Sequence, residues 1–191
     1  AIRMPSDPIA LELIRQGGGY IAAPSANTSG RPSPTTAQHV YEDLQGKIPM
    51  ILDGGAVTIG LESTIVDLTE EIPTILRPGF ISLDMVQAVL GEAQIDRGLI
   101  ANDSNIHPKA PGMKYRHYAP KADLKIVEGP MEQVISYINE QAEKGRTGII
   151  CTEETRSRYP KGDIKCVGTR KDELSIASHL FAVLREFDED G

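Results

Sequence analysis

The sequence lacks any long hydrophobic run, and no stretch approaches the roughly 20 consecutive apolar residues that a membrane-spanning helix needs. It also contains neither a Gly-x-Gly-x-x-Gly fingerprint nor a Walker loop, which excludes two common ways of holding nucleotide phosphates. Its two cysteines, Cys151 and Cys166, form no Cys-x-x-Cys pair and have no histidine cluster beside them. We interpret them as buried, reduced thiols of a cytosolic protein.

An excess of positive charge is missing as well. The chain has 20 Lys and Arg against 27 Asp and Glu, a formal net charge of −7. This balance argues against a surface that binds nucleic acid as a whole, although one local basic pocket remains compatible with it. The four histidines and the acids show no metal-ligand spacing, and Ser25 is not in a Gly-x-Ser-x-Gly elbow. We therefore expect neither a protein metal cage nor a nucleophile-and-base site.

What the sequence does contain is a dense polar stretch at residues 22–35. It follows an apolar run at 20–23 and precedes an apolar-periodic run, which predicts a strand, a polar loop and then a helix over 35–45. Ser33 would cap this helix and Pro34 would be its first residue. Helix N-termini with neighbouring hydroxyls suit anions, phosphate above all. The alternative is an ordinary polar turn before a capped helix.

Local signals predict most of the remaining elements. In the first half we expect a helix that begins after Asp7 and ends at Gly17, a strand over 49–52, a hairpin of 65–68 with 73–77, and a helix over 83–90 capped by Ser82. His39 lies off the apolar stripe of its helix and is interpreted as solvated. The hairpin predicts a mixed sheet.

Residues 91–120 show no periodicity and have loop composition, which predicts a long linker. Beyond the linker, strands alternate with helices, and this order predicts a parallel sheet with right-handed crossovers. The expected strands are 124–127, 147–151 and 164–167, and the expected helices are 131–144 and 175–188. His179, on the last helix, is interpreted as a surface residue.

Three motifs resemble those of the Sua5/YrdC family of threonylcarbamoyl-AMP synthases, in its two-domain form, and the resemblance covers essentially the whole chain. They are Pro24-Ser25-Ala26-Asn27-x-Ser29-Gly30-x-x-Ser33-Pro34-Thr35, then Glu62-Ser63-Thr64-Ile65-Val66-Asp67 with Leu76-Arg77-Pro78-Gly79, and then Pro111-Gly112-Met113-Lys114-Tyr115-Arg116-His117-Tyr118-Ala119-Pro120.

The resemblance implies an α/β fold in three parts. Residues 1–92 would be part of a YrdC-like domain, a twisted mixed sheet with helices, 93–121 a linker that acts as a lid, and 122–191 an incomplete Rossmann-like parallel α/β Sua5 domain. The family's Thr-x-Thr-x-Tyr-Gly-Leu loop and its Lys/Arg phosphate motif are not in this sequence. We therefore expect a chain shortened at both ends relative to the family, and inactive by itself.

The implied reaction joins L-threonine, bicarbonate and ATP to give threonylcarbamoyl-AMP and pyrophosphate. The product would serve the threonylcarbamoyladenosine modification at position 37 of tRNA. A downstream transferase complex would bind the tRNA, so this protein would meet tRNA only indirectly. Mg²⁺ would be held mainly by the ATP phosphates, and the protein would be cytoplasmic with no membrane contact.

The resemblance also implies roles for individual residues. Those expected to bind ATP or its phosphates are Ser25, Asn27, Ser33, Ser63 and Arg77. Those expected near threonine or the carbamate are Arg3 and Ser63, and those of the lid are Tyr115, Arg116, His117 and Tyr118. No residue is assigned as a chemical catalyst. An RNA-binding module and a regulatory YrdC-like protein without catalysis remain alternatives. A carbamoyltransferase of the hydrogenase-maturation type shares the YrdC-like domain but would not be expected to carry the linker segment at 115–120.

Overall fold

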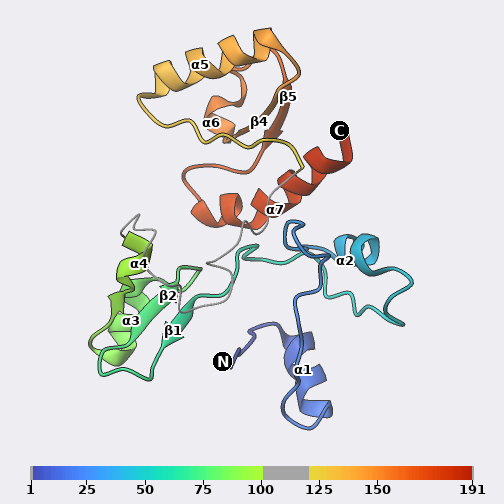
Figure 1. Ribbon diagram of the computed structural model, residues 1–191, viewed down its shortest axis with the longest axis vertical. Coiled ribbons are helices and arrows are strands. Elements are labelled where there is room, and N and C mark those ends of the chain that lie inside the picture. The colour runs from blue at the N-terminus through green and yellow to red at the C-terminus, as the bar shows by residue number, and fades with distance from the viewer. Residues whose placement is uncertain (1, 101–120, 191) are drawn as a thin grey trace. The chain divides into compact units, whose positions relative to one another are not determined.

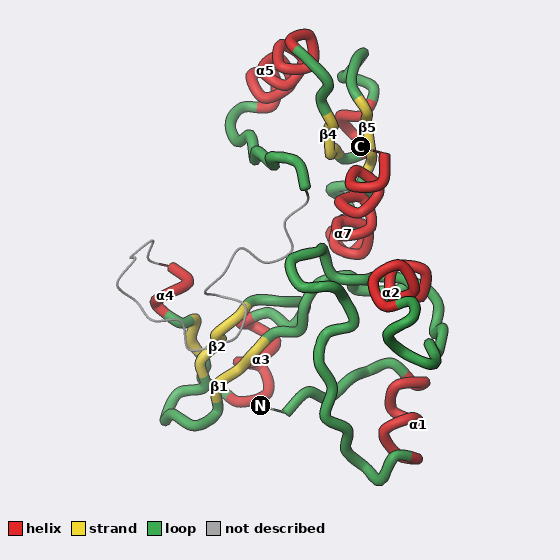
Figure 2. The backbone as a smooth tube through the Cα atoms, turned by 45° about the vertical axis from the view of Figure 1, so that its right-hand side comes forward, coloured by secondary structure: helices red, strands yellow, loops and turns green. Residues whose placement is uncertain are grey.

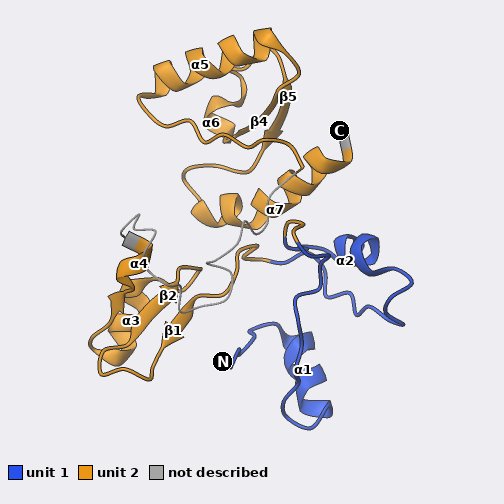
Figure 3. Ribbon diagram, in the orientation of Figure 1, with its two compact units in different colours: residues 1–29, 33–57 blue, residues 30–32, 58–191 orange. Residues whose placement is uncertain are grey.

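The computed structural model describes residues 2–100 and 121–190. The chain divides into two compact units (Figure 3). The first unit consists of Ala1–Ser29 and Ser33–Val57, and the second of Gly30–Pro32 and Thr58–Gly191. The described elements are helices, mostly short, and strands of two to four residues, numbered in chain order, and most of them are labelled in Figure 1.

The first unit holds two helices, α1 (Pro8–Gln16) and α2 (Ala37–Leu44). Asp7 caps α1 by accepting a hydrogen bond from the Ala10 amide at 2.8 Å, and Pro8 is its first residue, as predicted. None of the nine described residues of α1 is buried. Loops make up most of the rest of this unit (Figure 2).

Two predicted strands of the first unit are wrong. In the described structure residues 20–23 and 49–52 have extended or irregular backbone and pair with no other strand. Tyr20 and Met50 are 87% and 71% exposed. A strand is stabilised by the ladder it shares with a neighbour, so a short apolar run alone does not make one.

The first sheet of the second unit is mixed. Strands β1 (Ile65–Asp67) and β2 (Thr74–Arg77) form the predicted antiparallel hairpin, and β3 (Gln94–Ile95) adds in parallel to β2. Helix α3 (Leu83–Leu90), capped by Ser82 as predicted, lies along this sheet (Figure 1). Their buried contacts form one small core of Ile75, Val86 and Ala93.

The start of the predicted linker is ordered. Strand β3 and the short helix α4 (Arg97–Ile100) both fall after Gly91, so the expectation of loop structure is wrong for residues 94–100. The cause is non-local: the Gln94 amide donates to the Pro73 carbonyl and the Asp96 amide to that of Ile75. A strand of two residues is too short to show an alternation of apolar and polar residues in the sequence.

The remaining elements of the second unit follow the predicted order. Helix α5 (Met131–Lys144) precedes β4 (Gly148–Cys151), a short helix α6 (Glu153–Arg156), β5 (Asp163–Cys166) and the long helix α7 (Glu173–Asp190). Strands β4 and β5 are parallel and place Cys151 opposite Cys166. The predicted strand at 124–127 is not formed in the described structure.

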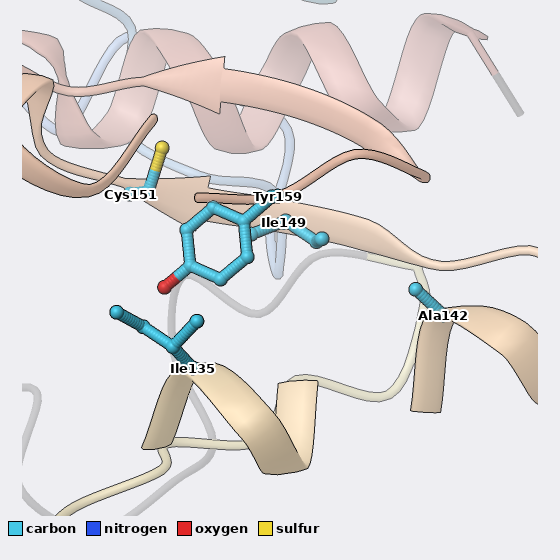
Figure 4. Close-up of a cluster of buried hydrophobic side chains, with 5 residues drawn as sticks. All are labelled: Ile135, Ala142, Ile149, Cys151 and Tyr159. Atoms are coloured by element: carbon cyan, nitrogen blue, oxygen red, sulfur yellow. The ribbon is translucent and has the colours of Figure 1, made fainter. Parts of the chain in front are cut away.

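A compact hydrophobic cluster joins α5 to β4. Ile135 and Ala142 point from the helix toward Ile149, Cys151 and the ring of Tyr159, and all five are buried (Figure 4). Both cysteines are free thiols, as predicted, but only Cys151 is buried, whereas Cys166 is half-buried. Burial raises the pKa of Cys151. Among the described helices, none combines the length and the apolar character that crossing a bilayer requires.

A carboxylate on α6 fastens the loop that follows β5. Oε1 of Glu154 accepts hydrogen bonds from Thr169 Oγ1 at 2.5 Å and from the Arg170 amide at 2.9 Å. The bond from Thr169 is the largest of the causes that lower the pKa of Glu154 from 4.5 to about 2. A lowered pKa means that the folded state favours the ionised form of Glu154.

This loop generates a prediction about acid stability. Stability from a carboxylate of lowered pKa is present above pH 4.5 and is lost as the pH falls toward 2. The difference in unfolding free energy between wild type and Glu154→Gln should therefore shrink over this range, as measured by urea unfolding followed by circular dichroism. Glu153→Gln, on the same turn, controls for loss of a charge. A difference that stays constant or grows as the pH falls would contradict the prediction.

Candidate functional site

The polar loop of the first unit is fastened by a buried acid on α2. The Thr28 amide donates to Oδ2 of Asp43 at 3.0 Å, and Thr28 Oγ1 donates to the Asp43 carbonyl at 3.2 Å. Asp43 is only 4% exposed. A buried carboxylate is stable where N–H and O–H groups surround it, so the loop and the helix fix each other.

The three expected phosphate-binding residues of this loop differ in exposure. Ser25 is exposed, whereas Asn27 and Ser33 are half-buried. The Nδ2 group of Asn27 donates to the Thr28 carbonyl at 3.1 Å, and Thr28 in turn is held by Asp43. Ser25 is thus exposed to solvent, and the loop is anchored just after it, at Asn27 and Thr28.

The predicted cap of α2 is wrong by three residues. Thr36, with extended φ and ψ, caps the helix and accepts from the His39 amide at 3.3 Å, so Ser33 lies before the helix and outside its first turn. His39 is half-buried instead of solvated, because its Nδ1 accepts from the Thr35 amide at 3.2 Å. The polar loop therefore extends to Thr36.

A second polar group lies in the second unit, at the start of the β1–β2 hairpin. Arg77 donates from Nε and Nη2 to the carbonyl of Ser63, at 3.1 and 2.8 Å. Gly79 packs directly on the segment that precedes β1: a β-carbon there would overlap the Glu62 carbonyl and lie 2.6 Å from the Thr64 amide. The two halves of the motif, 62–67 and 76–79, therefore meet at backbone level.

This arrangement leaves polar groups available to a ligand. The Ser63 side chain is exposed, and Arg77 holds this residue through its backbone carbonyl. Arg77 is half-buried and uses two of its five N–H donors on that carbonyl. A guanidinium held in this way is a preorganised partner for a carboxylate or a phosphate.

The structure brings together some expected site residues and separates others. Ser63 and Arg77 are in contact within the second unit. Arg3 is exposed and belongs to the first unit, as do Ser25, Asn27 and Ser33. The expected lid residues Tyr115, Arg116, His117 and Tyr118 lie outside the described residues.

Two residues that sequence reasoning missed are Asp43 and Gly79. Asp43 comes one residue before Leu44, at the edge of the apolar stripe of α2. An acid in that position was the sign in the sequence that this carboxylate is buried. Gly79 was part of the motif at 76–79, but nothing in the sequence indicated its packing role. The close backbone contact that requires glycine there involves residues 15 to 17 positions earlier, which no local pattern reports.

The described residues also define what the site does not contain. They include no group of three or more His, Cys, Asp or Glu side chains that could hold a metal ion. An open hollow of about 560 Å³ lies elsewhere in the second unit, between residues 125–128 and the first half of α5. It is lined by Lys125, Gln133 and Tyr137 among others, and includes no expected site residue.

Both halves of the chain match known families. Residues 1–79 match the Sua5/YciO/YrdC family, described as telomere recombination. Residues 81–191 match the family described as threonylcarbamoyl-AMP synthase, C-terminal domain. The boundary between the two matches falls just after Gly79.

Curated relatives and a solved structure agree with these matches. The chain is 48% identical over 191 residues to a threonylcarbamoyl-AMP synthase of Bacillus subtilis, and 44% identical over 196 residues to one of Pyrococcus abyssi. Each match covers all of this chain but only 55% and 56% of the relative. The crystal structure of P. abyssi Sua5 complexed with L-threonine superposes with a TM-score of 0.85, at 43% identity, over 99% of this chain and 55% of that one. The chain thus spans about half the length of these relatives.

The contact between Thr28 and Asp43 generates a prediction about stability. Asp43→Ala removes a buried acceptor and leaves the Thr28 amide without it, which should lower the unfolding free energy by about 1–3 kcal/mol. Glu42→Ala, a neighbouring acid on the same helix, should change it by no more than about 0.5 kcal/mol. Urea unfolding of the two variants measures both values, and equal effects would show that Asp43 has no special role.

Proposed function

Because the chain belongs to the Sua5 family of threonylcarbamoyl-AMP synthases, we propose that it carries part of the site that makes threonylcarbamoyl-AMP. The observation that carries this proposal is identity of 48% and 44% to two such enzymes over the whole chain. A solved relative bound to L-threonine, with the same fold over 99% of this chain, supports threonine as a substrate.

The proposed reaction needs no covalent enzyme intermediate. The amine of L-threonine combines with the CO₂ of bicarbonate to form a carbamate. A carbamate oxygen then bonds to the α-phosphorus of ATP, the bond to the β-phosphate oxygen breaks, and pyrophosphate leaves. What such a transfer requires of a protein is positioning and stabilisation of charge by fixed donors.

The two polar groups suit these requirements. We assign the loop of Ser25, Asn27 and Ser33 to the ATP phosphates, because hydroxyl and amide donors on an anchored backbone need little reorganisation to meet an anion. We assign Ser63 and Arg77 to ATP as well, with Ser63 also within the threonine or carbamate subsite. Arg3, an exposed guanidinium, is proposed for the threonine carboxylate.

We propose that Mg²⁺ accompanies ATP at this site and is held mainly by phosphate oxygens and water. It would supply neutralisation of phosphate charge. The product is proposed to pass to a cytoplasmic transferase complex that modifies position 37 of tRNA, so this protein meets tRNA only indirectly.

We keep the three-part division of the chain as a proposal: residues 1–92 as part of the catalytic domain, 93–121 as linker and 122–191 as the second domain. Activity is proposed for a protein of the relatives' full length. The 191 residues alone, which lack the phosphate-binding Lys/Arg motif that the family resemblance implies, should release no pyrophosphate.

The test is threonine-dependent release of pyrophosphate from ATP by a full-length protein containing these residues. Asn27→Ala should lower kcat/KM by about 1–3 kcal/mol, which is roughly 5- to 150-fold, because it removes a donor to a charged group. Gln38→Ala, which removes an exposed amide on α2, is the control and should leave turnover unchanged. Turnover that does not depend on threonine would overturn the proposed reaction, and unchanged turnover in Asn27→Ala would overturn the role of the loop.

A further inference from the structure

Helix α7 contacts the first half of the chain at two places. One is Gly60, with φ of +72°, where a β-carbon would lie 2.5 Å from the Ala177 carbonyl and 2.6 Å from the Ser178 Cα. The other is Pro32, less than 2% exposed, which meets α7 through Arg185. All of these residues belong to the second unit (Figure 3).

The contact at Pro32 involves a completely buried charge. Arg185 is 0% exposed, and it donates from Nε at 3.1 Å and from Nη2 at 2.5 Å to the Pro32 carbonyl. Both lone pairs of that oxygen can be used in this way. A guanidinium is costly to bury unless its N–H groups meet acceptors, so the arginine and the carbonyl hold each other in place.

Helix α7 is itself well anchored, so it can act as a fixed support. A β-carbon on Gly148 of β4 would lie 2.7 Å from the Phe187 ring, which shows how closely the helix packs on its sheet. The Lys165 ammonium of β5 lies 5.1 Å from the centre of the same ring and 3.3 Å from the Glu186 carboxylate. One residue further along α7, buried Asp188 accepts from the Lys121 amide at 2.7 Å.

We propose that Arg185 is a positioning residue for the polar loop: through the Pro32 carbonyl, the C-terminal domain sets the backbone of residues 30–32. These three residues separate Ser29 from Ser33 in the chain, so their conformation constrains both ends of the loop that we assign to ATP phosphates. Pro32 suits the role because its ring restricts φ and leaves only the carbonyl to pair. The effect on ATP rests on the proposed function, whereas the effect on the backbone does not.

The first test measures the backbone directly. Hydrogen exchange of the full-length protein is followed by mass spectrometry of peptides covering residues 28–36. Arg185→Met keeps the bulk of the side chain but removes its donors, and it should speed exchange in these peptides by about tenfold. Lys161→Met removes an exposed cation of the same unit that pairs with Glu143, and it should leave the loop peptides unchanged. Equal exchange in wild type and Arg185→Met, or an increase spread evenly over the chain, would overturn the proposal.

Arg185→Lys keeps the proposal testable if the methionine variant does not fold. Lysine retains the charge but has a shorter reach and no fork to place two N–H groups on one oxygen, so loop exchange should rise by a smaller factor, about threefold. If Arg185→Met is unfolded, loop exchange in Arg185→Lys that equals the wild-type rate would overturn the proposal.

The second test measures ATP use. Arg185→Met should raise KM for ATP by about tenfold while kcat falls by less than threefold, because the loop must be ordered when ATP binds. A fall in kcat alone would contradict a positioning role at the phosphates. If the wild type itself makes no pyrophosphate, the proposed function fails, and the exchange experiment still decides whether Arg185 positions the loop.

Discussion

Fixation of loop backbone by charged side chains is the constraint on which the proposed site depends. Polar loops have no strand ladder to hold them, and their amides and carbonyls need partners when they are buried. Here Asp43 accepts from the Thr28 amide, Arg77 donates to the Ser63 carbonyl and Arg185 donates to the Pro32 carbonyl. The side chains of Ser25 and Ser63 are exposed to solvent on these fixed backbones.

Local packing explains why such contacts are needed. In the first unit, helix α1 buries none of its described residues, and extended apolar residues such as Tyr20 are largely exposed. A unit with so little apolar core gains correspondingly little stability from burial. Single hydrogen bonds to buried charges therefore matter more to loop conformation there than they would around a large core.

Sequence reasoning succeeded where the signal is local. Asp7 with Pro8 and Ser82 with Gly91 marked the ends of two helices, and the apolar face of α5 was readable from its spacing. It failed where a partner distant in sequence decides the outcome. Residues 20–23 and 124–127 look like strands but have no pairing partner among the described residues, whereas β3 is only two residues long and exists through its pairing with β2.

The same distinction applies to the site. The residue types in the polar loop pointed to anion binding, the family resemblance implied a binding role for Ser63 and Arg77, and the structure joins Ser63 to Arg77. The residues that hold these groups in place were not foreseen, because Asp43 acts 15 positions away from Thr28 and Arg185 acts 153 positions away from Pro32. Spacing along the chain carries no trace of such contacts.

The central claim is that both polar groups are ordered before any ligand binds. Hydrogen exchange of the full-length protein, in peptides covering residues 25–36 and 62–79, measures this most directly when it is compared with and without ATP and L-threonine. The account predicts slow exchange of the Thr28 and Thr35 amides already in the ligand-free protein, with little further slowing on addition of both substrates. Rapid exchange that becomes slow only when the substrates are present would contradict it.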